Sequence, residues 1–210
     1  MQGLIKKDLL MIKSNTKLLG ILLIIYAVMA YEGQMDLSFL LPFMSVMIMI
    51  STFSYDAYNK WDSYVITFPK GRKNSVKAKY LATILLIIIT TIILSILTIL
   101  IAYLKDNLID FNNLISSLLG IVLATTLIQS LMYPAIYKFG LEKARIGLFI
   151  LIFGIAIIGS ILLKFLSFEV PKNLITILNT YGLILIPLIA TLILFISYKI
   201  SEHIFLNKEF

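Results

Sequence analysis

The sequence predicts an all-α fold: a polytopic membrane protein with six transmembrane helices, an N-terminal amphipathic interfacial helix, and a cytoplasmic helix between spans two and three. Three observations support this prediction. Hydrophobic residues make up 60% of the 210-residue chain, above the roughly 45–50% of soluble domains. Charged residues are absent from several long runs, and Lys and Arg are concentrated in alternate connecting segments. We expect residues 1–210 to form a single transmembrane domain.

Six charge-free runs define the expected spans, because a transmembrane helix needs about 20 mostly apolar residues. The first run, 18–31, is short, but snorkelling of Lys13 and Lys17 would extend it. An interfacial or half-crossing helix is the alternative for this segment. The expected spans are about 16–31, 37–54, 80–104, 113–137, 146–164 and 183–200.

The distribution of Lys and Arg predicts the orientation. Four lie in the N-terminal segment, six in the 56–79 loop, three in the 138–145 loop and two at the C-terminus. The other three loops hold three in total. Basic residues mark cytoplasmic segments, so we expect a multi-pass protein of the plasma membrane with both termini in the cytoplasm. The basic residues are then signals of topology and contacts for anionic lipid, and the net charge of +7 does not indicate nucleic-acid binding.

Residues 2–14 are expected to form the surface helix, with Lys6, Lys7 and Lys13 on one arc and apolar side chains on the opposite arc. Asp8 is an exception because it falls within the apolar arc. It could form a salt bridge with a nearby lysine or contact a partner protein.

The longest hydrophilic segment joins spans two and three. Tyr58, Trp61, Val65 and Phe68 recur at helical spacing, and Pro69 with Gly71 would end this helix. One interpretation is an amphipathic helix whose aromatic side chains rest at the lipid interface. The other is a docking helix for a cytoplasmic protein, with Trp and Tyr as anchors.

Polar residues are sparse in the expected spans. No acidic or basic residue lies well inside any span, which disfavours an ion-coupled carrier, because such carriers hold ionisable groups at mid-membrane depth. Ser51, Gln129 and Tyr133 are candidate pathway-lining residues, although Gln129 could instead form a hydrogen bond between helices. Between spans five and six, Pro171 and Gly182 bound a short outer helix expected at about 171–181.

Several kinds of chemistry lack the residues they need. The chain has no Cys and a single His, His203, so neither a thiol nor a zinc site is expected. It also lacks the GxxxxGK[ST] loop that binds nucleotide phosphates. We therefore expect neither an enzyme nor a chain that binds its own cofactor or metal.

Two motifs carry a resemblance to a known family: KKDLL at 6–10, and the stretch from Ser51 to Leu81, which ends with Lys79 and Tyr80 entering span three. With these motifs, the chain resembles the small six-span permease subunits of ABC type-2 exporters from Gram-positive bacteria. Phe68 stands where that family often has Leu.

The resemblance implies that segment 55–72 contains a coupling helix that docks on a separate cytoplasmic ABC ATPase, which binds ATP and magnesium. It also implies a second permease copy or paralogue, and a cargo of amphipathic or antimicrobial peptides. The implied docking residues are Tyr55, Asp56, Tyr58, Asn59, Lys60, Trp61 and Asp62 of the coupling segment, and Lys6, Lys7 and Asp8 of the N-terminal helix.

Two alternatives remain open on the sequence. The chain could be a membrane anchor or sensor that recruits a cytoplasmic protein without transporting anything. It could also be an exporter of lipid or of small hydrophobic drugs.

Overall fold

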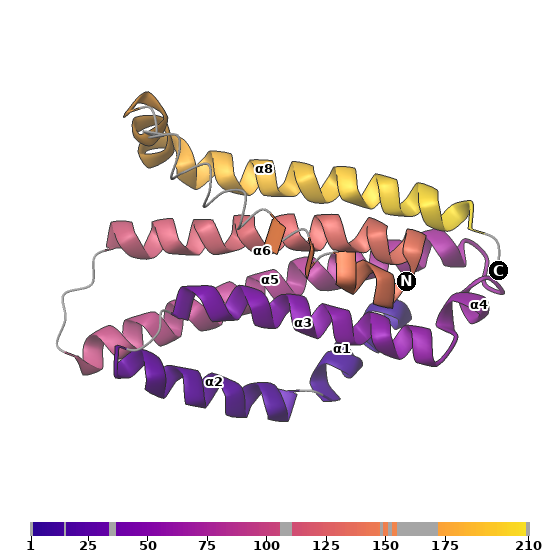
Figure 1. Ribbon diagram of the computed structural model, residues 1–210, viewed down its shortest axis with the longest axis horizontal. Helices are drawn as coiled ribbons and strands as arrows, with labels where there is room; N and C mark the ends of the chain where they lie inside the picture. Colours follow the sequence, from indigo (N-terminus) through magenta and orange to yellow (C-terminus); the bar gives the residue numbers. More distant parts are fainter. Residues whose placement is uncertain are drawn as a thin grey trace.

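A computed structural model describes residues 2–14, 16–33, 37–105, 111–147, 149–150, 153–154 and 172–208. Every regular element within these ranges is a helix (Figure 1), which confirms the all-α prediction. The labelled helices are α1 (Gln2–Ser14), α2 (Thr16–Tyr31), α3 (Leu37–Tyr58), α4 (Trp61–Val65), α5 (Gly71–Leu104), α6 (Phe111–Phe139) and α8 (Lys172–Leu206).

Three helical segments within the described residues are long and apolar enough to cross a membrane: Gly71–Leu104, Leu114–Phe139 and Tyr181–Leu206. Most of the expected fifth span at 146–164 lies outside the described residues. The number of six spans therefore stays a prediction.

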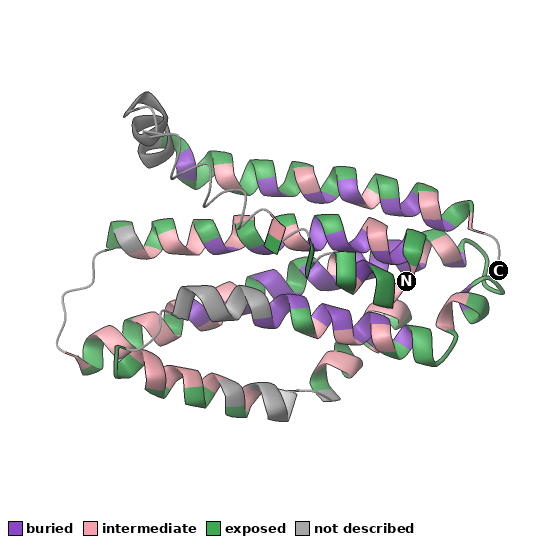
Figure 2. Cartoon of the chain, viewed as in Figure 1, coloured by how far each residue is buried: buried purple, intermediate pink, exposed green. Residues whose placement is uncertain are grey.

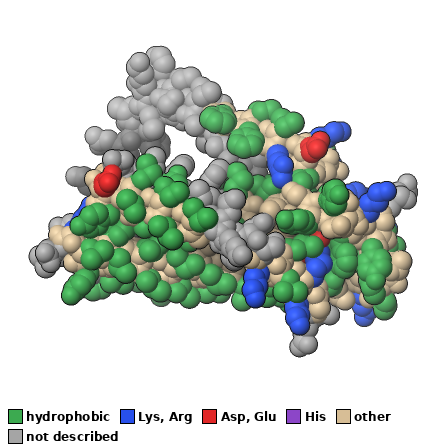
Figure 3. All heavy atoms as spheres, turned by 90° about the horizontal axis from the view of Figure 1, so that it is seen from below, with side chains coloured by type: hydrophobic (Ala, Val, Ile, Leu, Met, Phe, Trp, Pro, Cys, Tyr) green, Lys and Arg blue, Asp and Glu red, His purple; other side chains and the backbone are tan. Residues whose placement is uncertain are grey.

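The long helices lie roughly along one axis, and α6 packs against α8 while α3 and α5 pack together (Figure 1). Helix α4 and both ends of the chain lie toward the same end of the bundle. We call this end, which also includes the 66–70 turn and the C-terminal residues of α8, the α4 end. Lys and Arg side chains gather toward it on the face shown in Figure 3, and hydrophobic side chains cover the opposite part of that face.

The spacing of the aromatic residues in segment 55–68 suggested a single helix, but the structure divides this segment between two helices. Helix α3 continues to Tyr58, and the chain reverses at Lys60, whose φ of 49° is left-handed. The side chain of Asn59 donates a hydrogen bond to the carbonyl of Tyr55 and completes the last turn of α3. The short helix α4 follows, so Tyr58 and Trp61 stand on different helices.

The turn between α4 and α5 depends on Gly71. Lys70 precedes it with a φ of 57°, and a Cβ atom at Gly71 would lie 1.9 Å from the carbonyl oxygen of Val65. Only glycine permits this close approach. Helix α5 thus begins at Gly71, nine residues before the expected start of span three.

The outer helix expected at 171–181 and the sixth span expected at 183–200 are a single helix, α8. Gly182 and Pro187 both lie within it. Membrane helices tolerate both residue types, because neighbouring groups can satisfy the freed backbone atoms.

Burial is greatest in the half of the bundle nearest the α4 end (Figure 2). The main hydrophobic cluster joins α3, α5, α6 and α8 there through Met49, Phe53, Tyr80, Tyr133 and Phe205. Along α5 and α8, large apolar residues such as Ile88, Ile92, Leu192 and Phe195 are exposed. An exposed apolar surface of this kind is suited to contact with the acyl chains of membrane lipids.

Candidate functional site

Four charged side chains meet inside the bundle near the α4 end. Lys79 Nζ of α5 lies 2.9 Å from Asp8 Oδ1 of α1 and 2.7 Å from Asp56 Oδ2 of α3. Lys7 Nζ lies 2.5 Å from Asp56 Oδ1 and 3.4 Å from Asp8 Oδ1. These four contacts form a closed ring in which positive and negative groups alternate, and we call it the charge ring.

The charge ring is shielded from solvent. The side chains of Lys79 and Asp8 are each 2% exposed, and that of Asp56 is 7% exposed. Burying a lone charge is expensive, but two lysines and two aspartates give a neutral set in which every charge has a partner. The ring therefore joins α1, α3 and α5, and losing one member would leave a net charge in this buried site.

Aromatic side chains extend the charge ring to α4. Lys7 Nζ lies 4.1 Å from the centroid of the Trp61 ring, within range of a cation–π interaction. Trp61 in turn packs against Tyr64, and Tyr64 against Phe68. The indole N–H of Trp61 is buried and has no hydrogen-bond partner within the described part of the chain. Val65 of α4 is fully buried in the main hydrophobic cluster, so apolar packing and the Lys7–Trp61 contact together hold α4 to the bundle.

The structure divides the predicted docking residues into three groups: exposed, partly buried and buried. Tyr55, Tyr58, Asn59, Lys60 and Lys6 are exposed, with Tyr58 at 87%. Trp61, Asp62 and Lys7 are partly buried.

Asp8 and Asp56 are buried and paired with lysines of the same chain. Of the two interpretations of Asp8, the structure shows the salt bridge. Both aspartates have an internal role here, because their carboxylates do not reach the surface.

The C-terminal end of α8 belongs to the same surface as the 66–74 segment. Arg72 Nη1 donates a 2.6 Å hydrogen bond to the carbonyl of Leu206, and Lys73 Nζ lies 2.9 Å from Glu202 Oε1. Lys208 Nζ lies 3.9 Å from Asp62 Oδ2. Partial burial raises the pKa of the Asp62 carboxyl, an effect that Lys208 opposes.

A recess of about 460 Å³ lies between this segment and α8. Phe68 and Leu206 supply apolar walls, and Lys70, Arg72 and Lys73 supply positive charge. The α4 end thus presents exposed aromatic side chains beside a basic hollow.

The three candidate pathway residues have different environments. Ser51 donates a hydrogen bond to the carbonyl of Ile48 in its own helix. The hydroxyl of Tyr133 pairs with Thr83, and its ring packs against Phe53 and Tyr80. Both residues therefore have a structural role in this conformation.

Gln129 differs from the other two candidates. Its side chain is fully buried on α6, yet neither its amide nitrogen nor its amide oxygen has a partner within the described residues. The expected hydrogen bond between helices is therefore not formed there.

Lys79 is the main residue that the sequence did not assign to the site. Its position at the entry to span three suggested only a topology signal. The clue is a pair of misfits, because Asp8 falls on the apolar arc of its helix and Lys79 falls on the buried face of α5. Tyr80, which bonds Ser197 and Ser201 of α8, was likewise not expected to link helices.

These features define the class of the protein. It is a helical integral membrane domain whose long helices expose apolar side chains, and one end of its bundle carries basic and aromatic residues. The sequence pattern of the family described as ABC-2 family transporter protein matches residues 3–206, so the chain belongs to that family. No curated protein and no solved structure matches the chain. The chain is therefore an ABC-2 type permease, the membrane component of a transporter.

Proposed function

We propose that this permease is a subunit of an ATP-driven exporter that moves amphipathic or antimicrobial peptides out of the cell. A separate cytoplasmic ABC ATPase supplies the energy, and a second copy or a paralogue of the chain completes the pathway. The α4 end is the cytoplasmic end, as the distribution of Lys and Arg predicts. The observation that carries the proposal is the charge ring beneath an exposed aromatic segment. Because this ring connects the segment to α5, a movement of the segment is transmitted to that helix.

The docking surface consists of the exposed residues around the α3–α4 corner. Tyr58 is 87% exposed, and Tyr55, Tyr64 and Phe68 are also exposed at this end. Tyrosine and tryptophan are frequent anchors at protein interfaces because they bury a large area at low entropic cost. Lys60 and the basic recess favour an acidic surface on the ATPase.

The charge ring links this surface to the transmembrane helices. Trp61 of α4 contacts Lys7, and Lys7 contacts Asp56 of α3. Asp56 contacts Lys79, which lies near the start of the long helix α5. Because each charge is held by two opposite charges, a displacement of the α3–α4 corner acts on α1 and α5 together. We infer that closure of the ATPase moves these helices as one unit.

The peptide cargo is supported by the family resemblance and by the apolar character of the described helices. Export of lipid or of small hydrophobic drugs is the alternative within the same mechanism. A membrane anchor or sensor would use the same docking surface without transport. ATP-dependent uptake of a labelled amphipathic peptide into inside-out vesicles separates these cases, and ATPase binding with no cargo movement would indicate the anchor.

Copurification tests the docking surface. We expect Tyr58→Ala to lower recovery of the cytoplasmic ABC ATPase by about tenfold or more, as for an anchor residue worth at least about 1.4 kcal/mol. Tyr103→Ala is the matched control, because Tyr103 is 80% exposed on α5 at the opposite end. Recovery that is equal for Tyr58→Ala and Tyr103→Ala would refute the assignment. Asp56→Lys is a poorer test, since it would disrupt the charge ring itself.

A further inference from the structure

A cavity of about 230 Å³ lies where α1, α2, α3 and α5 meet. Leu9 and Ile12 of α1 line one wall of the cavity, and Gly20 of α2 and Ile48 of α3 also belong to its lining. On α5 its lining runs from Leu86 to Ile93. The cavity lies apart from the docking surface.

Among the described residues, the cavity lining offers water few hydrogen-bond partners. Thr90 is the one polar side chain of these lining residues, and its hydroxyl is within 2.9 Å of the backbone carbonyls of Leu86 and Ile87. A water molecule needs two to four polar partners, so a cavity like this stays dry. Hydrocarbon is the chemistry that fits it.

The cavity is reachable from the lipid side and follows the helix axis. Leu9 at its α1 end is 38% exposed, and Ile89 on α5 is 50% exposed. The seven-residue step from Leu86 to Ile93 covers about 10 Å of helix. An extended alkyl chain that enters beneath α1 would lie along α5 over this length.

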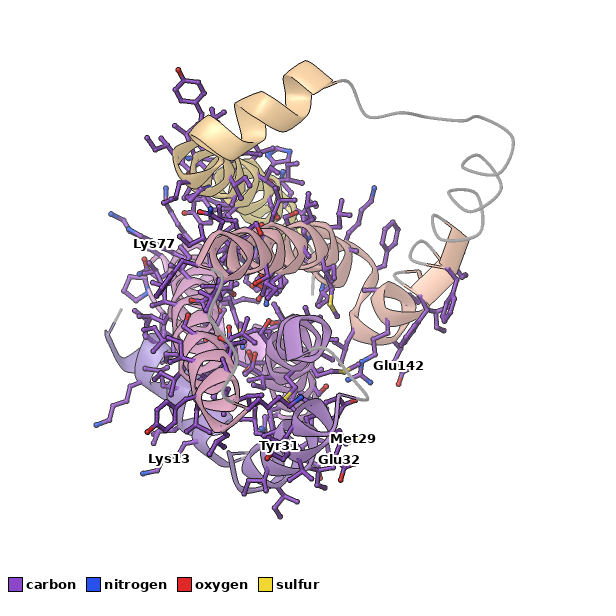
Figure 4. The ribbon with its side chains drawn as sticks, turned by 90° about the vertical axis from the view of Figure 1, so that its left-hand side faces the viewer. Lys13, Met29, Tyr31, Glu32, Lys77 and Glu142 are labelled. Atoms are coloured by element: carbon purple, nitrogen blue, oxygen red, sulfur yellow. The ribbon has the colours of Figure 1, made fainter. Side chains whose placement is uncertain are left out.

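Charge at the α1 end indicates which lipid would supply the chain. Lys13 directly follows Ile12, is exposed, and lies at the periphery of the bundle in Figure 4. Lys6 on the same helix is also exposed. Lysine near a membrane surface attracts anionic headgroups.

We propose that this cavity binds one acyl chain of an anionic phospholipid, with the headgroup beside Lys13. The bound chain fills the space between α1 and the α2, α3 and α5 helices and holds α1 against them. This site is independent of ATPase docking, so either proposal can fail without the other.

Photocrosslinking of the full chain in vesicles tests the site. The probe is phosphatidylglycerol with a diazirine in one acyl chain, and phosphatidylcholine with the same acyl chains is the comparison. We expect labelled peptides from α1, α2, α3 and α5 at the cavity, with stronger labelling by phosphatidylglycerol. Excess unlabelled phosphatidylglycerol should compete with this labelling in the unaltered chain.

Gly20→Leu is the decisive variant, because a Cβ at Gly20 meets no atom within 4 Å and the added side chain has room to occupy the cavity. We expect cavity labelling to fall roughly tenfold, the change that follows when about two methylene groups lose their burial. Gly120→Leu is the matched control, since Gly120 on α6 also has nothing within 4 Å. Lys13→Gln should reduce the preference for phosphatidylglycerol, and Lys60→Gln should not.

Three results would overturn the proposal. One is equal cavity labelling of Gly20→Leu and Gly120→Leu, and another is equal labelling by the two lipids. The third applies to the unaltered chain and so does not depend on the folding of a variant: cavity labelling that excess phosphatidylglycerol fails to reduce.

Discussion

Replacing Lys79 with methionine should destabilise the protein strongly, because it removes the charge that contacts two buried carboxylates. Lys79 Nζ is 2.9 Å from Asp8 and 2.7 Å from Asp56, and its side chain is 2% exposed. After the substitution, Lys7 alone faces both aspartates, and the ring carries one net negative charge. Breaking a buried ion pair by removing one partner costs about 3–5 kcal/mol. Methionine keeps most of the side-chain volume, so the loss reflects the charge.

Thermal unfolding of the purified chain in detergent measures this effect. Lys73→Met is the matched control, because Lys73 also lies on α5 and pairs with Glu202, but its side chain is 53% exposed. Such a surface pair contributes little, because water screens the attraction and the long side chain loses entropy. We therefore expect the Tm to fall much further for Lys79→Met than for Lys73→Met.

A second substitution separates loss of charge balance from loss of packing. Asp8→Asn in the Lys79→Met background leaves Lys7 and Asp56 as a neutral pair. We expect it to recover part of the stability, with a coupling of about 0.5–3 kcal/mol between the two sites. Equal Tm values for Lys79→Met and Lys73→Met, or no recovery in the double variant, would refute the account of the charge ring.

Two other substitutions test the fold around the site. Gly71→Ala should lower the Tm by an amount equivalent to about 1–3 kcal/mol, since its Cβ would meet the carbonyl oxygen of Val65 at 1.9 Å; a loss no larger than that of Gly120→Ala would contradict this. Gln129→Leu should raise stability by about 1–3 kcal/mol, because it removes a buried amide that has no partner among the described residues. If Gln129 also lines the pathway, the same variant should lose peptide export, and an unchanged or lower Tm would show that the amide is bonded.

The sequence was a good guide to features that repeat along one helix. Charge-free runs and the position of Lys and Arg predicted an all-α membrane protein, and the arc of lysines on residues 2–14 predicted an amphipathic segment. The spacing of Tyr58 and Trp61 was misleading, because the left-handed turn at Lys60 places them on different helices. Helical periodicity alone does not reveal a turn that an αL residue introduces.

The partners in the candidate site come from distant parts of the chain. Asp8, Asp56 and Lys79 lie on three helices, and no local sequence pattern predicts that their side chains are in contact. In the sequence, Asp8 stood out only as an acidic residue on an apolar arc, Asp56 was a predicted docking residue, and Lys79 was a topology signal. Their pairing depends on how α1, α3 and α5 pack, and burial without a partner would have been costly for each.

Crosslinking from a single thiol tests the central claim most directly, and the chain contains no Cys. Tyr58→Cys places a thiol at the α3–α4 corner, and Tyr103→Cys places one at the opposite end of the bundle. A bifunctional thiol–amine reagent is applied to membranes that contain the permease and its ABC ATPase. The account predicts a permease–ATPase product from Tyr58→Cys and none from Tyr103→Cys. No product from Tyr58→Cys, or equal product from both variants, would contradict it.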